Sequence, residues 1–356
     1  MVDKVICVGS LGDYRHAVVT HILGMTGSEL LIIAGDQPIE PTVRVLDLDH
    51  ARLKRVRNIF LFGRKITIQM GGFYQCLQAS SLIVDLNPRS LSVWAILILR
   101  RIVFRRTVVW GHAWPRRGAD AASDVIRGVQ RKLAGNVLVY TQTQANELLR
   151  RYPKLHVVAA SNAIYSAKMM RALPPTRKDG LDIIYVGRLV AEKKPSLLLE
   201  AFMKGAHELP AQTRLVFVGA GPELARMKEA AKGSRHADRI CFKGHVTDPV
   251  LLESLYRDAL FSVSPGYVGL SITQSFGFGV AMLISRDERH SPEIEAAIEG
   301  VNAKFFQTDS VDDLVRQMGL LFSESDYWIS QRTHISKICS DNYSAENMAM
   351  NILGAL

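Results

Sequence analysis

The sequence is short of acidic residues in one long segment. Between His50 and Arg117 there are thirteen lysines and arginines but a single acid, Asp85, so this segment carries a charge of +12. The whole chain carries +10, which leaves 31 basic and 33 acidic side chains outside the segment. We therefore expect the positive segment either to attract an anionic partner such as lipid, phosphate or nucleic acid, or to form a solvated basic face.

Cysteine is also scarce. The four cysteines lie far apart and form neither a C-x-x-C pair nor a zinc-type spacing with histidine; they are Cys7, Cys76, Cys241 and Cys339. We expect reduced thiols in a cytosolic protein. The first residues, MVDKVICVGS, hold only a short apolar run, so we expect a strand there and no secretion signal.

Charge is absent from residues 259–285, a run long enough for a membrane span. Its composition argues against a span, because Pro265, four glycines and several Ser, Thr and Gln side chains would place polar groups in hydrocarbon. The stretch SPGYVGLSITQSFGFG at 264–279 is instead expected to contain a strand end, a tight glycine-rich turn and the start of a buried helix.

Short apolar runs alternate with helical patterns along all 356 residues, a length suited to two domains. This pattern predicts α/β domains with parallel sheets covered on both faces. The expected strands are residues 4–9, 29–35, 81–86, 107–112 and 136–141, followed by 181–187, 214–220, 239–244, 260–265, 281–285 and 303–306.

A linker is expected at residues 166–180, where Pro174, Pro175 and Gly180 interrupt the pattern. The predicted domains are therefore 1–165 and 181–340. Residues 341–356 are expected to form a helix that begins after Ser344 and crosses back to the first domain. Two sheets that face one another would bind ligand in a cleft at the carboxyl ends of their strands.

Arg188 and Lys193 follow the strand at 181–187 and suit a diphosphate, although an exposed basic loop would look the same. The segments IIYVGRLVAEKKPSLLLEAF, LVFVGAGPEL, the 264–279 stretch and HSPEIEAA together resemble the donor domain of group 1 (family 4) retaining glycosyltransferases. That family has the GT-B architecture of two Rossmann-like domains. The resemblance is clear from about 181 to 306 and looser elsewhere.

The resemblance implies that Arg188 and Lys193 bind the diphosphate of a nucleotide sugar. The further donor-binding residues that it implies are Gly12, Gly219, Gly221, His245, Gly266, Tyr267, Gly269, Leu270, Gln274 and Glu293. His112, at a strand end, corresponds to a family histidine near the donor sugar, or is structural. The family glutamates of the E-x7-E element fall on Gly266, which has no side chain, and on Gln274, whose amide can still bind ribose.

Several positions keep two interpretations. Gln274 could be a buried helix residue, Gly266 a simple turn and Glu293 a helix cap. Asp287, Glu288 and His290 are nearby in sequence and could supply a polar contact to the sugar. The helix start near Leu270 would turn its free N–H groups toward the diphosphate.

In the first domain, Gly9 and Gly12 resemble the family's phosphate-approaching loop. The acceptor candidates that follow are Asp13, Tyr14, Arg15 and His16. Asn162 is expected to order the interdomain crossover. The one D-x-D, Asp47-Leu48-Asp49, lies in an expected helix start and is assigned a cap or surface role, and no metal or other cofactor is expected.

Residues 91–106, LSVWAILILRRIVFRR, are expected either to cover the sheet or to lie as an interfacial helix among anionic headgroups. The leading hypothesis is a metal-independent retaining hexosyltransferase, using a UDP-sugar rather than a GDP- or ADP-sugar, that extends a saccharide or lipid-linked acceptor. It would act in surface polysaccharide, lipopolysaccharide or glycolipid synthesis, in the cytoplasm and peripherally on the inner face of the plasma membrane. The alternatives are a catalytically silent GT-B subunit and a nucleotide-sugar epimerase. Nucleic acid is not an expected partner, because it would not explain Arg188 and Lys193.

Overall fold

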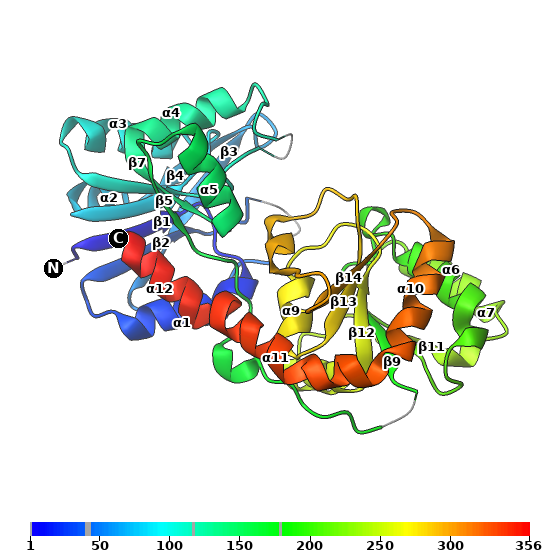
Figure 1. Ribbon diagram of the computed structural model, residues 1–356. Coiled ribbons are helices and arrows are strands. Elements are labelled where there is room, and N and C mark those ends of the chain that lie inside the picture. The colour runs from blue at the N-terminus through cyan, green and yellow to red at the C-terminus, as the bar shows by residue number, and fades with distance from the viewer. Residues whose placement is uncertain (1, 40–43, 116–117, 178–179) are drawn as a thin grey trace. The chain divides into compact units, whose positions relative to one another are not determined.

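The computed structural model describes residues 2–39, 44–115, 118–177 and 180–356. The chain divides into two compact units (Figure 1). Unit 1 comprises Met1–Ile164 together with Ala345–Leu356, and unit 2 comprises Tyr165–Ser344. Each unit is built on a sheet of its own.

Unit 1 contains an eight-stranded sheet in the order β4-β3-β2-β1-β5-β6-β7-β8. Neighbouring strands are parallel except β3 and β4, which form an antiparallel pair. The strands are β1 Lys4–Val8, β2 Leu30–Gly35, β3 Leu53–Leu61, β4 Ile66–Met70, β5 Ser81–Asp85, β6 Arg106–Trp110, β7 Gly135–Val139 and β8 His156–Ala159. The central strands are almost wholly buried, as their unbroken Val/Ile/Leu sequences predict.

Helices cover both faces of this sheet. Two separate clusters of buried side chains form, one containing residues of α1 and α12, the other containing residues of α2, α3, α4 and α5. These helices are α1 His16–Met25, α2 Phe73–Gln78, α3 Leu91–Ile102, α4 Asp124–Ala134, α5 Gln142–Arg151 and α12 Ala345–Ala355. Helix α12 is therefore part of unit 1 although it follows unit 2 in the sequence, and its Met348 and Ile352 are buried as the sequence predicts.

Unit 2 contains a fully parallel six-stranded sheet in the order β11-β10-β9-β12-β13-β14. The strands are β9 Asp182–Val186, β10 Leu215–Val218, β11 Ile240–Phe242, β12 Ala259–Ser264, β13 Ala281–Ser285 and β14 Ala303–Phe306. The helices are α6 Pro195–Gly205, α7 Leu224–Lys232, α8 Pro249–Arg257, α9 Ser271–Gly277, α10 Val311–Ser323 and α11 Ser325–Tyr343. The uncharged run at 259–285 is thus two buried strands of the sheet with the short helix α9 between them.

The predicted α/β class and every predicted strand are confirmed, but three strands of unit 1 were not predicted: β3, β4 and β8. The helix start expected at Asp47–His50 is wrong, because these residues are irregular and lead into β3. Strand β3 mixes buried and exposed residues: Lys54 and Arg57 are exposed, whereas Arg55 is half-buried and donates to the Leu46 carbonyl. Basic residues within a strand resemble the charged side of a helix, which explains why the expectation is wrong.

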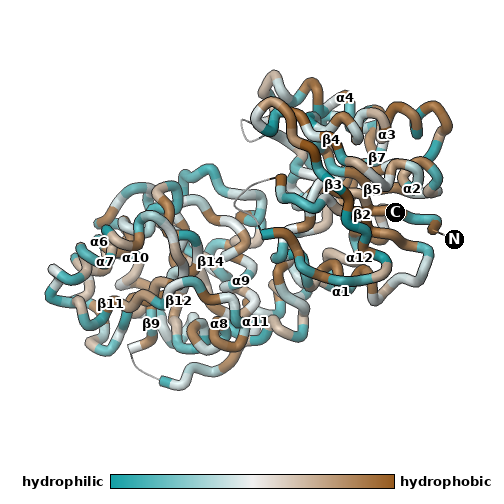
Figure 2. Tube along the Cα trace, turned by 180° about the vertical axis from the view of Figure 1, so that it is seen from behind, coloured by the Kyte–Doolittle hydropathy of each residue, from teal (hydrophilic) through white to brown (hydrophobic). Residues whose placement is uncertain are grey.

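Helix α3 has two apolar sides. Val93, Ile96 and Leu97 are buried toward the sheet, so the covering role is confirmed. The other side exposes apolar side chains to solvent: Ile98 is 48% and Ile102 65% exposed. Figure 2 shows the hydrophobic colour along this helix. Among the described helices, none combines the length and apolar character needed to cross a membrane.

Candidate functional site

The predicted cations of unit 2 lie where the chain leaves β9. The Tyr185 hydroxyl donates a hydrogen bond of 2.8 Å to the Arg188 carbonyl, which ties this loop to the end of the strand. A 3₁₀ turn at Ala191–Lys193 then leads into α6, with Pro195 as its first residue. Both cations are therefore presented at the carboxyl edge of the sheet, where open α/β sheets bind ligands.

Tyr267, from the turn after the neighbouring strand β12, joins the two cations. Arg188 Nη2 donates to the Tyr267 hydroxyl at 3.2 Å, and Lys193 Nζ donates to the Tyr267 carbonyl at 3.3 Å. Lys193 Nζ also lies 4.2 Å from the centre of the Tyr267 ring. Two positive groups thus converge around one aromatic side chain, an arrangement that suits an anionic ligand.

The charge of Lys193 is costly in this position. Burial, together with repulsion from Arg188, lowers its pKa to about 8, while the nearby Glu293 carboxylate acts in the opposite direction. Glu293 is itself only 8% exposed. A bound diphosphate would restore the pKa of Lys193 toward its ordinary value, so the site favours an anion on electrostatic grounds.

Gly266 lies against the backbone of the cation loop. A Cβ added at Gly266 would come within 2.5 Å of the Glu192 carbonyl oxygen and 2.8 Å of Lys193 Cα. A Cβ at Gly269 would meet only Ser291 Oγ, at 3.7 Å. The position that aligns with the sugar-facing glutamate of the resembling family therefore has no space for a side chain in this chain.

Gly219 and Gly221 pack against the same loop from the other side. A Cβ on Gly219 would lie 1.8 Å from the Gly187 carbonyl oxygen, and one on Gly221 would lie 2.2 Å from the Leu189 carbonyl oxygen. The Gly219 N–H donates to the Gly244 carbonyl at 2.7 Å, which brings in the segment that carries the exposed His245. Loops after four strands thus meet at one edge.

His290 holds the turn after β12 in place. Its Nδ1 accepts from the Val268 N–H at 3.0 Å, so Nε2 carries the proton and donates to the Ser285 carbonyl at 2.9 Å. Burial lowers the pKa of His290, which keeps the ring neutral. The interpretation of His290 as a sugar contact is therefore replaced by a positioning role.

Other predicted residues have partners in this unit. The Gln274 amide on α9 donates to the Tyr165 hydroxyl at 2.7 Å. Glu288 is paired with Lys194 at 2.6 Å, and Lys194 also contacts Asp309 at 2.6 Å. Asp287 is exposed and Leu270 directly precedes α9. Of these, Gln274 and Leu270 remain candidates for donor contacts.

Asp85 is a site feature of unit 1 that was not predicted. It ends β5, and its Oδ2 accepts a hydrogen bond of 2.5 Å from the Gly9 N–H in the first turn of the chain. Burial raises the pKa of Asp85 to about 6, against the opposing effects of that hydrogen bond and of Arg15. The signal was present in the sequence, since Asp85 is the one acid of the basic segment and ends a predicted strand.

Arg15 is turned into unit 1. It is 7% exposed, donates to Tyr140 Oη at 3.4 Å and to Asn162 Oδ1 at 3.2 Å, and lies 4.7 Å from the centre of the Trp110 ring. Because Arg15 is buried, it is no longer a candidate for acceptor binding. Its neighbours Asp13, Tyr14 and His16 remain candidates, and Asp13 and His16 are exposed. Asn162 holds Arg15 within this unit.

His112 follows β6 and is exposed, with its ring 4.7 Å from that of Tyr140. Gly12 forms an isolated bridge with Val45. Neither observation decides their predicted roles, which remain predictions. Within the described ranges, no group of three or more His, Cys, Asp or Glu side chains could hold a metal ion.

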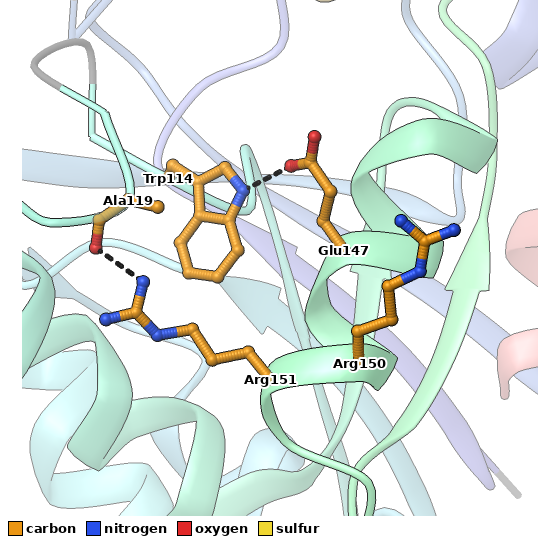
Figure 3. A pocket seen from close by; sticks show the side chains of 5 residues that line it. All are labelled: Trp114, Ala119, Glu147, Arg150 and Arg151. Carbon is orange, nitrogen blue, oxygen red and sulfur yellow. Dashed lines mark hydrogen bonds between the residues drawn. The ribbon is translucent and has the colours of Figure 1, made fainter.

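An open pocket of about 580 Å³ lies beside α5 in unit 1 (Figure 3). Its lining consists of Trp114, Ala119, Glu147, Arg150 and Arg151. None of these was predicted as a site residue. A smaller pocket of about 340 Å³ lies at the start of α6 in unit 2 and includes Lys194, Glu223 and Arg226.

The chain is similar to known proteins in part of its sequence and in its fold. Residues 169–338 match the family model described as Glycosyl transferases group 1. No curated protein matches the sequence. One similar solved structure is the lipopolysaccharide outer core galactosyltransferase WaaB in its apo form, with 13% identity, coverage of 99% of this chain and 98% of that chain, and a TM-score of 0.68. A second is Anabaena Alr3699/HepE in complex with UDP, with 12% identity, coverage of 100% of both chains and a TM-score of 0.69. A third is sucrose-phosphate synthase from Thermosynechococcus elongatus, with 14% identity, coverage of 99% of this chain and 98% of that chain, and a TM-score of 0.69.

These structures share the fold of the whole chain, and the family match falls inside unit 2. The residues matched include both cations, the glycine turns and Glu293. The protein therefore has the GT-B fold, and its second unit is similar to the group 1 glycosyl transferases.

Proposed function

We propose that the protein is a retaining glycosyltransferase that takes its sugar from a nucleotide donor, with UDP preferred, and transfers it to a saccharide or lipid-linked saccharide. The observation that carries this proposal is the convergence of Arg188 and Lys193 on Tyr267 at the carboxyl edge of the second sheet. The similarity of residues 169–338 to group 1 glycosyl transferases supports it, as does the likeness in fold to a protein solved with UDP and with UDP and glucose.

The chemistry asked of these residues is electrostatic. The bond between the sugar C1 and the diphosphate oxygen breaks with its electron pair on the diphosphate, and Arg188 and Lys193 stabilise that charge. The acceptor oxygen forms its bond to C1 on the same face, and its proton passes to the departing diphosphate oxygen. Tyr267 and the close-packed glycines keep both cations in position, so that little reorganisation is needed during the reaction.

We further propose that the protein works in the cytoplasm against the inner face of the plasma membrane, in the synthesis of surface polysaccharide or lipopolysaccharide. The exposed apolar side of α3 supports this proposal, together with the exposed Arg101 in its last turn and the 88% exposed Phe104 just after the helix. Apolar side chains beside arginines are typical of surfaces that enter an anionic headgroup layer.

The test uses purified protein, radiolabelled UDP-, GDP- and ADP-sugars, and membrane extract as a source of acceptor. We expect transfer from a UDP-sugar, reduced at least tenfold by Arg188→Ala and by Lys193→Ala, since each removes a charged contact worth about 1.5–3 kcal/mol. Lys204→Ala is the control, because Lys204 lies in the same unit on the exposed side of α6 and pairs with Asp312.

Other outcomes favour other functions. Donor binding without transfer would indicate a catalytically silent subunit, and release of an epimerised nucleotide sugar without acceptor would indicate an epimerase. The absence of donor binding would overturn the proposal.

A further inference from the structure

The pocket beside α5 joins two segments of unit 1. Trp114 and Ala119 come from the loop that follows β6, and Glu147, Arg150 and Arg151 come from the second half of α5. In Figure 3 the three side chains of α5 and the indole of Trp114 border one open space. Its volume of about 580 Å³ falls within the range of about 300–1,000 Å³ that small-ligand pockets occupy.

The indole ring of Trp114 is fixed from the protein side. Its Nε1 donates to Glu147 Oε2 at 2.6 Å. The Arg131 guanidinium lies 5.3 Å from the ring and is held in turn by Asp124 at 2.6 Å and by the Ala113 carbonyl at 2.7 Å. Arg131 and Asp124 are both buried. The ring is therefore a rigid apolar platform, which reduces the entropy lost when a ligand stacks on it.

Two guanidinium groups border the platform. The Arg151 guanidinium lies over the Trp114 ring, 5.5 Å from its centre, and donates to the Ala119 carbonyl at 3.2 Å. Its ion pair with Asp120 is weakly held, because the Asp120 side chain is 94% exposed. Arg150 is exposed and makes no hydrogen bond or ion pair with any described residue. With Glu147 as the one acid of the lining, the lining residues carry an excess of one positive charge, and the exposed Asp120 is the further acid that pairs with Arg151.

We propose that this pocket binds an anionic sugar ring, one that bears a carboxylate or a sulfate. The apolar C–H face of the sugar stacks on the indole, the guanidinium groups of Arg150 and Arg151 bind the anion through paired N–H donors, and Glu147 accepts from a sugar hydroxyl. The pocket thus offers an apolar platform, a hydroxyl acceptor and a planar anion binder. These match the apolar face, the hydroxyl groups and the anion of such a sugar.

The position in the chain gives the subsite its role. Trp114 is two residues after His112, which follows the carboxyl end of β6. A saccharide bound at that edge of the sheet can therefore continue along the loop into the pocket. This role rests on the proposed function, in which unit 1 holds a saccharide acceptor, and adds that the acceptor carries a negative charge.

Binding is tested with tetragalacturonate and a sulfated heparin tetrasaccharide, compared with neutral maltotetraose and with inorganic sulfate at equal ionic strength. Calorimetry and tryptophan fluorescence report the affinity. We expect at least one anionic tetrasaccharide to bind at least tenfold more tightly than maltotetraose or sulfate. The double variant Arg150→Ala/Arg151→Ala should lose at least tenfold, and Trp114→Ala should weaken binding more than Trp114→Phe, which keeps an aromatic face.

The control is the double variant Arg89→Ala/Arg101→Ala, which removes the same charge from other exposed positions of unit 1. Equal weakening by this control would show a diffuse charge effect and overturn the proposal. So would tight binding of sulfate alone, or failure of both anionic tetrasaccharides to bind. Urea unfolding curves confirm that each variant folds.

UDP binding is measured on the same samples and on Arg188→Ala. If UDP binds in the wild type but no anionic saccharide does, the subsite fails and the proposed function stands. If the saccharide binds at Trp114 but UDP does not bind at all, the proposed function fails and the pocket remains a saccharide site.

Discussion

At the residue scale, substitutions of Gly266 test whether this position is a glycine for steric reasons. We expect Gly266→Ala to destabilise unit 2 by about 1–3 kcal/mol and to weaken UDP binding, because the added Cβ meets the backbone of Glu192 and Lys193. Gly269→Ala is the matched control, with ordinary contact distances around its added Cβ. Urea unfolding and calorimetry with UDP measure both effects. Gly266→Glu should not raise activity, and a gain in turnover would contradict the steric explanation.

Lys193 gives a pH dependence of known sign. Its pKa in the folded protein, about 8, lies below the ordinary value of 10.5, so between these pH values the unfolded chain binds more protons than the folded one. The contribution of Lys193 to stability is therefore unfavourable below pH 8 and improves as the pH rises from 8 to 10.5. Affinity for UDP changes in the opposite direction, because the neutral amine no longer attracts the diphosphate.

We expect the dissociation constant of UDP to rise by about tenfold from pH 7.5 to 9.5, measured by calorimetry. Lys193→Gln should bind UDP weakly with a much flatter pH profile. An unchanged pH profile in that variant would assign the titration to another group.

The sequence predicted Arg188 and Lys193 because their spacing after a strand is a local pattern. It did not predict the Asp85 contact with Gly9, or His290 between Val268 and Ser285, since these pairs form only when the sheets assemble. For the same reason the burial of Arg15 against Tyr140 and Asn162 could not be read from its neighbours in the sequence.

At the element scale, α3 packs one apolar side on the sheet and exposes further apolar side chains on its other side. We expect wild-type protein to sediment with vesicles rich in anionic lipid, and the double variant Ile98→Asn/Ile102→Asn to do so at least fivefold less. Added salt should weaken binding, because the arginines contribute electrostatically. Val250→Asn is the control, since Val250 is 71% exposed on α8 of unit 2.

Absence of wild-type binding to these vesicles, or an equal loss in the control variant, would contradict the membrane proposal. Transfer to a water-soluble acceptor should be the same in the wild type and in Ile98→Asn/Ile102→Asn, and this comparison separates membrane attachment from catalysis.

Strand elements were predictable from sequence in proportion to their burial. Strands such as β5 and β12, buried along their length, are continuous apolar runs. The hairpin of β3 and β4 is only partly buried, and the basic residues of β3 interrupt the apolar pattern from which a strand is predicted.

At the scale of the whole molecule, α12 makes unit 1 discontinuous in sequence. Met348 is 1% exposed in the core that α12 forms with α1, and His21 on α1 lies 3.2 Å from Glu346 on α12. We expect Met348→Ala to destabilise unit 1 by about 2–5 kcal/mol. Met350→Ala, on the same helix but 53% exposed, should change stability by less than about 0.5 kcal/mol.

Hydrogen exchange resolved by peptide checks this prediction, because protection should fall in α1 and the first sheet and persist in β9 to β14. Equal loss of protection in both units would show that they unfold together.

The position of α12 also affects the order in which the protein can fold during synthesis. Residues 345–355 leave the ribosome only after the whole of unit 2, residues 165–344, has been made. At about 5–20 residues per second, the first 164 residues wait roughly 10–40 s without their last helix. During that interval the apolar side of α1 that packs with α12 lacks its partner, so we expect the nascent unit 1 to expose a surface of the kind that chaperones bind until α12 has been made.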